Sequence, residues 1–248
     1  MRVRSGRWRS ARRLVRCAWP LLLFTGCRFG APPGATDQGK RISDLYQLMF
    51  WVAIVVAATV YVLILWCVVR YRRRPRDGDE LPPQFRKHIP LEVTYTIIPL
   101  LIVIGIFVAT FRTENKVDLV SSDPAVVVNV TAFQWQWRFE YPKSGVNIIG
   151  RVGEPPTLVL PVGQTVRINL RATDVAHAFF VPAFLFKRDA IPGHETHFDL
   201  KVTEAGTFHG ECAEFCGLDH GEMNFTVRAV SPPAFQQWVT KEQQGSAP

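Results

Sequence analysis

The sequence predicts a hairpin of two transmembrane helices followed by an all-β domain with the fold of a barrel or a sandwich. Two observations predict the helices: residues 45–69 and residues 93–111 are long apolar runs without a formally charged side chain. At about 1.5 Å per residue, each run approaches or exceeds the hydrocarbon thickness of a bilayer, which is roughly 30 Å. A third observation predicts the β domain, because apolar and polar residues alternate in short segments after residue 111.

The N-terminal segment predicts export. A basic region that ends at Arg16 precedes a short apolar stretch and the sequence Thr25-Gly26-Cys27, which is typical of a signal peptide over residues 1–26. Small residues before a cysteine resemble a lipoprotein signal, in which cleavage leaves Cys27 acylated; an ordinary secretory signal and an uncleaved leader remain open. Residues 27–44 are expected as an external linker. The seven arginines before Cys27 carry most of the formal charge of +8, so charge does not support a nucleic-acid surface.

The connecting loop predicts the orientation of the hairpin. Basic residues crowd residues 70–92, in the run Arg70-Tyr-Arg-Arg-Arg-Pro-Arg and again at 86–87. Because basic loops stay in the cytoplasm, this loop is expected inside, and both the N-terminal segment and residues 112–231 are expected outside. The chain is therefore expected to be a multi-pass protein of a bacterial plasma membrane, with its β domain on the external side.

Four segments of the external part alternate with the period of two that half-buried strands show. They are separated by turn sequences at 161–163, 192–193 and 205–206. Residues 112–231 are accordingly expected to form a barrel or sandwich, and residues 232–248 a polar tail that is loosely held apart from Phe235 and Trp238. The four segments are 126–130, 166–170, 198–202 and 225–230.

The densest group of chemically active residues lies near the end of the β domain. Within twelve residues the chain carries Cys212, Cys216, His220 and Met223. Thiolate, imidazole and thioether are soft or borderline ligands, and their combination favours copper over zinc or calcium. His177 follows a predicted strand and is the best candidate for a further ligand. Two alternatives stay open: a disulfide between the two cysteines of an exported domain, and a zinc site of two Cys and two His, which has no use for Met223.

The spacing Cys-x-x-x-Cys-x-x-x-His-x-x-Met with an upstream His resembles subunit II of the haem-copper cytochrome c oxidases, and the resemblance extends over about residues 42–230. It implies a cupredoxin-like external domain that holds a dinuclear copper centre, CuA. Cys212 and Cys216 would bridge both coppers. His177 and His220 would each cap one copper, and Met223 would be a weak axial ligand.

The resemblance implies roles for three more residues. The backbone carbonyl of Glu214 would be the second axial ligand, and its carboxylate would reach a magnesium or manganese ion at the boundary with subunit I. Trp135 would be the point at which electrons enter from a c-type cytochrome. It lies in an aromatic run, residues 133–141, whose positions 133, 135, 137 and 139 are expected on one face of a single strand; such a face is more often core. Glu92 would stand at the entrance of a proton channel, although an acidic residue at a helix start is also favoured by the helix dipole.

These roles together describe an electron-transfer subunit. It would accept electrons from a c-type cytochrome at CuA and pass them to haem in subunit I, where O2 is reduced to water and protons are pumped together with the other oxidase subunits. The chain has no Cys-x-x-Cys-His sequence, so haem is expected only in partner subunits. A quinol-oxidase subunit II would lack these copper ligands. A membrane-anchored copper-binding or chaperone cupredoxin is the alternative function.

Overall fold

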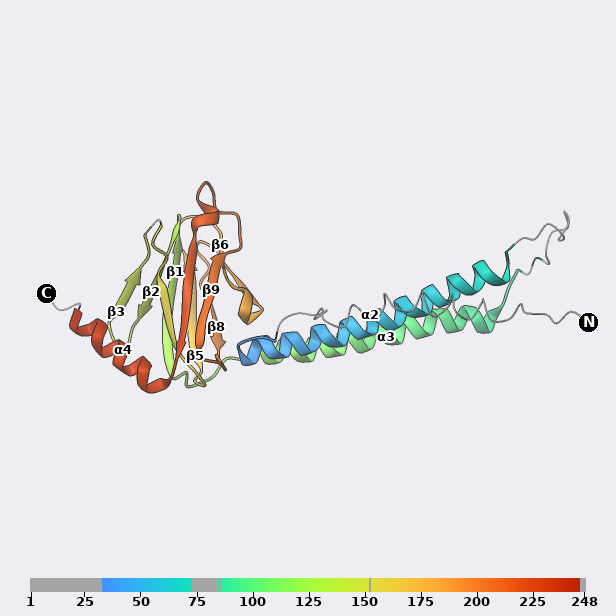
Figure 1. Cartoon of the computed structure of the whole chain (residues 1–248), viewed down its shortest axis with the longest axis horizontal. Coiled ribbons are helices and arrows are strands. Elements are labelled where there is room, and N and C mark those ends of the chain that lie inside the picture. The colour runs from blue at the N-terminus through green and yellow to red at the C-terminus, as the bar shows by residue number, and fades with distance from the viewer. Residues whose placement is uncertain (1–32, 73–83, 85, 152, 246–248) are drawn as a thin grey trace, which may run out of the picture. The chain divides into compact units, whose positions relative to one another are not determined.

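The computed structural model describes residues 33–72, 84, 86–151 and 153–245. Two long helices come first, α2 (Asp37–Arg70) and α3 (Ile89–Val117), and they lie side by side (Figure 1). Both are long and apolar enough to cross a membrane. The predicted signal peptide, Cys27 and most of the predicted loop at 70–92 lie outside the described residues.

Both helices are longer than the apolar runs that predict them. α2 begins at Asp37 because Thr36 caps it: the Oγ1 of Thr36 accepts a hydrogen bond of 2.9 Å from the amide of Gly39. Residues 37–44 are therefore helical, which corrects the expectation of a linker up to residue 44. α3 likewise continues past residue 111 to Val117. A search for apolar runs detects only the part of a helix that suits hydrocarbon, so it misses the polar turns at the ends.

The residues after α3 fold into a sandwich of two five-stranded sheets (Figure 1). Their strand orders are β3-β2-β1-β5-β8 and β4-β10-β9-β6-β7. The pairs β1–β5 and β4–β10 are parallel, and the other pairs are antiparallel. The strands are β1 (Val126–Phe133), β2 (Gln136–Tyr141), β3 (Val146–Ile149), β4 (Thr157–Pro161), β5 (Val166–Ala172), β6 (His177–Val181), β7 (Phe186–Ala190), β8 (Thr196–Leu200), β9 (Gly206–Cys212) and β10 (Asn224–Val230); short 3-10 helices, η2 (Pro182–Phe184) and η3 (His220–Glu222), follow β6 and precede β10.

Aromatic side chains fill the space between the two sheets. Trp137 from one sheet contacts Phe179 and Phe225 from the other, with ring centroids 6.1 and 5.2 Å apart, and Phe179 stacks on Phe225 at 4.8 Å. All three side chains are buried. Rings that pack edge to face or offset at these distances gain more than their buried area alone. The cluster forms a rigid core that reaches the end of the sandwich at which β6 begins.

The aromatic run at residues 133–141 forms two strands rather than the single predicted strand. β1 ends at Phe133, β2 begins at Gln136, and these two residues pair across the ladder. Because a two-residue turn reverses the chain, Phe133 shares a face with Gln136 and not with Trp137. The prediction of one aromatic face is therefore wrong: Trp137 lies in the core, and Trp135 lies half-buried in the turn.

The last described segment is helix α4 (Pro232–Gly245), where the sequence predicts a polar tail. Phe235, Trp238 and Val239 recur at the spacing of one helix face and pack against the core. The ring of Trp238 lies 5.1 Å from that of Tyr141, whose hydroxyl group is bonded to the amide and the carbonyl of Val159 at 2.9 Å each. The segment is therefore a helix rather than a loosely held tail, and Phe235 and Trp238, the two residues expected to be held, lie on its apolar face.

Candidate metal centre

Three neighbouring strands bring the predicted ligands to one end of the sandwich. His177 is the first residue of β6, Cys212 is the last residue of β9, and the loop that follows Cys212 returns to the sheet after Met223. β6 and β9 pair directly, which places His177 beside Cys212. A hydrogen bond of 3.0 Å from the Cys212 amide to the Met223 carbonyl closes the loop. The loop therefore begins and ends at fixed positions.

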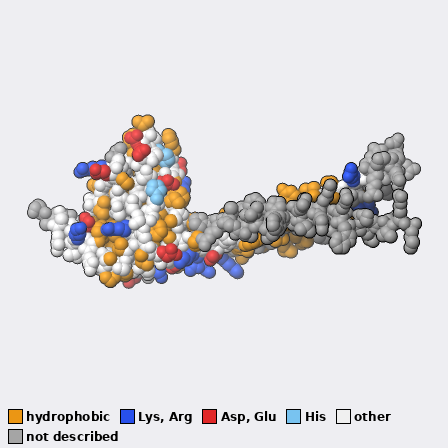
Figure 2. Space-filling model, in the orientation of Figure 1, with side chains coloured by type: hydrophobic (Ala, Val, Ile, Leu, Met, Phe, Trp, Pro, Cys, Tyr) orange, Lys and Arg blue, Asp and Glu red, His pale blue; other side chains and the backbone are white. Residues whose placement is uncertain are grey.

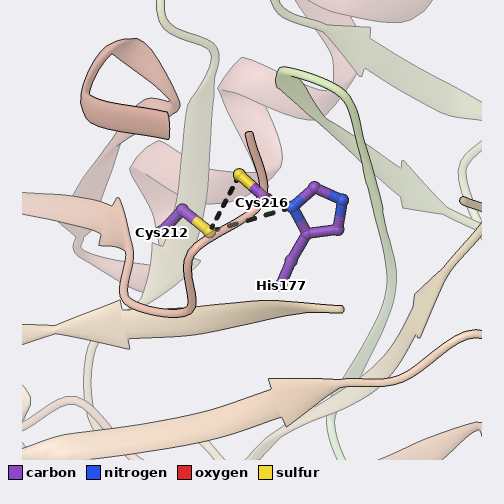
Figure 3. A group of neighbouring side chains, drawn as sticks. All are labelled: His177, Cys212 and Cys216. Atoms are coloured by element: carbon purple, nitrogen blue, oxygen red, sulfur yellow. Dashed lines mark hydrogen bonds between the residues drawn. The ribbon is translucent and has the colours of Figure 1, made fainter. Parts of the chain in front are cut away.

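The side chains of all five predicted ligands converge. Figure 3 shows the two sulfur atoms and the His177 ring pointing toward one another. The Nδ1 of His177 lies 3.8 Å from the Sγ of Cys212, and the two Sγ atoms are 3.9 Å apart. On the other side, the Sγ of Cys216 lies 3.5 Å from the Nδ1 of His220 and 3.8 Å from the Sδ of Met223.

The backbone carbonyl and the side chain of Glu214 make contacts in different parts of the structure. Its carbonyl oxygen lies 3.3 Å from the Sγ of Cys212 and thus belongs to the cluster of donor atoms. Its carboxylate is exposed and lies 3.4 Å from the Nζ of Lys187, which also pairs with Asp189 at 3.2 Å. The carbonyl therefore lies where the sequence predicts a ligand, whereas the carboxylate is held in a surface ion pair.

The geometry of the two cysteines bears on the chemical alternatives. Cys212 and Cys216 are free thiols, and their separation of 3.9 Å is far longer than the roughly 2.05 Å of a disulfide. Met223 is fully buried with its sulfur turned toward Cys216. Two thiols, two imidazoles, a thioether and a carbonyl form a soft donor set that suits copper, while a tetrahedral zinc site would leave the thioether unused.

The two thiols differ in their readiness to ionise. Burial opposes ionisation of Cys212, but the hydrogen bond with His177 and those with the backbone outweigh it and lower the pKa of its thiol to about 7. Burial and the neighbouring Cys212 raise the pKa of Cys216 to about 12. In the metal-free site Cys212 therefore ionises before Cys216 as the pH rises. Since a metal binds thiolates, a metal that binds here displaces the second proton.

Asp174 orients the buried imidazole of His177. One carboxylate oxygen lies 2.9 Å from the Nε2 of His177 and also accepts a hydrogen bond from the amide of Val175; the other accepts from the amide of Gln134 at 2.6 Å. Although partial burial works against the charge, these bonds lower the pKa of Asp174. The bond to Nε2 leaves Nδ1 facing the sulfurs, as a metal ligand requires. Sequence reasoning missed this role, and its only signal was the position of Asp174 three residues before His177.

The turn of the β1–β2 hairpin packs against the ligand loop. The carbonyl of Cys216 accepts hydrogen bonds from the Nε2 of Gln134 at 2.8 Å and from the indole Nε1 of Trp135 at 3.2 Å. Gly217 follows with a φ of 120°, and a Cβ there would lie 3.2 Å from the same two nitrogen atoms. Glycine thus permits the close approach of the two segments. Sequence analysis also missed Gln134, because it was expected on the polar face of a single strand.

Glu92 is not part of this cluster. It lies in the first turn of α3, where its Oε1 accepts a hydrogen bond of 3.2 Å from the amide of His88, the residue that caps the helix. About 37 Å of helix separates Glu92 from the end of α3 at Val117. The predicted site residues therefore divide into a group around the cysteines and one isolated carboxylate.

The hairpin turn predicts a test of how the ligands are held. Replacing Gln134 with Leu removes one of the two bonds to the Cys216 carbonyl, and we expect the copper dissociation constant to rise by roughly 10- to 100-fold, as is typical when an outer partner of a metal ligand is lost. Competition titration with a copper chelator measures this constant. Gln243→Leu is the matched control. Gln243 lies on α4, and its side chain donates a similar hydrogen bond of 2.7 Å to the carbonyl of Ser144, away from the ligands. Equal affinities of the two variants would show that the turn does not support the ligands.

Comparison with known proteins places this arrangement in a family. Residues 151–230 match the family model described as the periplasmic domain of cytochrome c oxidase subunit II, and residues 25–113 match that of its transmembrane domain. The probable cytochrome c oxidase subunit 2 of Streptomyces avermitilis is 38% identical over 88% of this chain and 82% of its own length. The cytochrome c oxidase subunit 2 of Mycobacterium bovis is 31% identical over 92% of this chain and 78% of its own length.

Solved structures include the periplasmic domain of subunit II of the Bradyrhizobium japonicum cytochrome oxidase, which is 31% identical to this chain. It aligns with a TM-score of 0.47 over 52% of this chain and all of the solved one. The family matches cover both the helical hairpin and the β domain, so the predicted fold of two membrane-spanning helices followed by an all-β sandwich is confirmed. On the strength of these relatives, the chain belongs to the family of cytochrome c oxidase subunit II.

Proposed function

We propose that the chain is the CuA-bearing electron-transfer subunit of a haem-copper oxidase in a bacterial plasma membrane. It takes electrons from a c-type cytochrome on the external side and passes them to haem in subunit I, where O2 is reduced to water and protons are pumped. The observation that carries the proposal is the convergence of two thiols, two imidazoles, a thioether and a carbonyl on one buried point.

The donor atoms form two similar halves, which supports two metal ions rather than one. Cys212 lies beside His177, and Cys216 lies beside His220. Each half has one weaker donor, namely the Glu214 carbonyl and the Met223 sulfur. A single tetrahedral ion would use four donors and leave two over, whereas two ions that share the sulfurs use all six. Copper bound in this way would supply one-electron redox chemistry with the charge spread over two metals.

The surroundings suit electron transfer because they hold the donors still. His177 and Met223 are fully buried, and Trp137 packs against His177 while its Nε1 donates to the Met223 carbonyl at 3.2 Å. Asp174 holds the other side of the His177 ring. Ligands held in place by packing and hydrogen bonds change their positions little when an electron arrives or leaves. A low reorganisation energy of this kind favours rapid electron transfer.

The exposed side of the ligand loop supports docking of the electron donor. Phe215 and Leu218 are 80% and 89% exposed, although both are large apolar residues. Apolar groups exposed at this level beside a functional site are typical of an interaction surface. The indole of Trp135 lies against this loop and is bonded to the carbonyl of Cys216. Trp135 therefore offers a short route from the surface to a copper ligand.

Two carboxylates complete the proposal. In the assembled oxidase the carboxylate of Glu214 gives up its ion pair with Lys187 and binds a magnesium or manganese ion at the boundary with subunit I. Glu92 stands at the entrance of a proton channel into subunit I, at the end of α3 that adjoins the hairpin loop. Its bond to the His88 amide also fits the alternative of a helix-capping charge, so its role needs a separate test.

Copper content tests the central proposal. We expect the purified chain, free of other subunits, to bind copper at a ratio of about two per chain and to show the spectrum of a delocalised pair, because six donors surround two shared sulfurs. Cys216→Ser should abolish that spectrum. Cys67→Ser is the matched control, since Cys67 is a free thiol on α2. A ratio of one with a spectrum localised on one ion would favour a copper-binding or chaperone protein instead.

Trp135 tests the route of the electrons. Loss of an aromatic residue from the centre of a docking surface costs about 2 kcal/mol or more, so Trp135→Ala should lower kcat/KM for the donor cytochrome by roughly tenfold or more. The copper spectrum should persist, because Gln134 still holds the Cys216 carbonyl. Stopped-flow reduction of the oxidase by the cytochrome measures both. Trp238→Ala, on the core-facing side of α4, is the control, and an unchanged rate in Trp135→Ala would remove Trp135 from the route.

Glu92 is tested by proton uptake in the assembled oxidase. Glu92→Gln keeps the shape of the side chain and removes its charge, and we expect slower proton uptake with unchanged reduction of copper by cytochrome c. Glu114→Gln, near the other end of α3, is the matched control. If proton uptake is the same in both variants, Glu92 is a capping residue only.

A further inference from the structure

A cavity lies between the two helices at the end where α2 begins and α3 ends. Its volume is about 250 Å³, and its lining includes Arg41 and Asp44 from α2 and Arg112 and Lys116 from α3. Leu45 and Leu48 line it further along α2. None of these residues contributes to the candidate copper site, so the cavity is a separate feature of the chain.

The two helices present these side chains on facing stripes. Arg41, Leu45 and Leu48 follow one another at steps of four and three residues, which places them on one face of α2. Arg112 and Lys116 are four residues apart and share a face of α3. The segment from Arg41 to Leu48 covers about 10 Å of helix. The cavity is therefore charged at one end and apolar at the other, as a phospholipid is where its headgroup meets its acyl chains.

The charges around the cavity are not balanced within the described chain. Three cations face one carboxylate, Asp44, and among the described residues none of the four has an ion-pair partner within 4.0 Å. Cations of the β domain such as Arg167 and Lys201 do have such partners. Figure 2 shows Lys and Arg side chains gathered at one end of the apolar helical segment. Unpaired cations at the edge of a membrane span attract anionic headgroups.

We propose that this cavity binds one anionic phospholipid from the leaflet that adjoins the β domain. The phosphodiester lies between Arg41, Arg112 and Lys116, where a guanidinium group donates paired hydrogen bonds to phosphate oxygens. An acyl chain runs along Leu45 and Leu48 toward the bilayer centre. Asp44 accepts hydrogen bonds from headgroup hydroxyl groups and repels a second anion, which makes a glycerol headgroup the best match.

Native mass spectrometry of the purified oxidase complex tests the proposal. The complex is stripped of lipid and then titrated with phosphatidylglycerol or with phosphatidylcholine of the same chain length. We expect one tightly held phosphatidylglycerol, and we expect Arg41→Gln to weaken its binding roughly tenfold or more through the loss of charge-assisted hydrogen bonds. Lys40→Gln is the matched control, because Lys40 adjoins Arg41 on α2 and is exposed but does not line the cavity.

Each outcome bears on the occupant. Equal affinity of the Arg41→Gln and Lys40→Gln complexes for phosphatidylglycerol overturns the proposal, and so does equal retention of the two lipids. Inorganic phosphate is expected not to compete; competition would assign the cavity to a free anion and overturn the lipid. Leu48→Ser should weaken binding of long-chain but not of short-chain phosphatidylglycerol. If the isolated chain holds the lipid and the complex does not, a partner subunit fills the cavity and the proposal fails.

Discussion

The pairing of β9 with both β6 and β10 is the constraint on which the metal centre depends. β6 supplies His177, β9 supplies Cys212, and β10 begins just after Met223, so adjacent strands fix both ends of the ligand loop and the upstream ligand. The hydrogen bond between the Cys212 amide and the Met223 carbonyl closes the loop. A slip of one residue in this register would turn Cys212 to the other face of the sheet. The register is held by the aromatic core, which buries Phe179 and Phe225 on these same strands.

A continuous set of hydrogen bonds joins the two halves of the centre from outside. His177 is bonded to Asp174, Asp174 accepts from the Gln134 amide, and the Gln134 side chain donates to the carbonyl of Cys216. Each half is thereby positioned relative to the other without a metal. The same bonds keep the sulfurs facing the imidazoles, whereas a disulfide would require the sulfurs to approach one another by nearly 2 Å. The arrangement favours free thiols that can receive metal.

The sequence predicted which side chains gather at the site better than it predicted the path of the chain around them. The soft ligands were recognisable from residue type and spacing, and an apolar run of sufficient length predicts a membrane helix. The turn at Gln134 and Trp135 was missed because a two-residue turn leaves the alternation of apolar and polar residues almost undisturbed. Asp174 and Gln134 could not be assigned, since their roles arise only because β1 and β5 end, and β6 begins, at the same edge of the sandwich. Helix α4 was missed because its apolar stripe contains only three residues.

The predicted functional residues differ between the β domain and the helices, because the β domain lies in water and the helices lie in the membrane. Every candidate metal donor lies in the β domain, where strands can hold buried polar atoms in fixed positions; among the described residues, α2 and α3 contribute none. A helix in hydrocarbon satisfies its own backbone and has little to offer a metal, so charged groups on it are confined to the ends of the span. Glu92 lies at one end of α3 and Arg112 and Lys116 at the other, beyond the apolar run in both cases. A lipid phosphate between the helices at the outer end would balance the charges that the described residues leave without partners there, just where the helices give way to the domain that holds the candidate metal ligands.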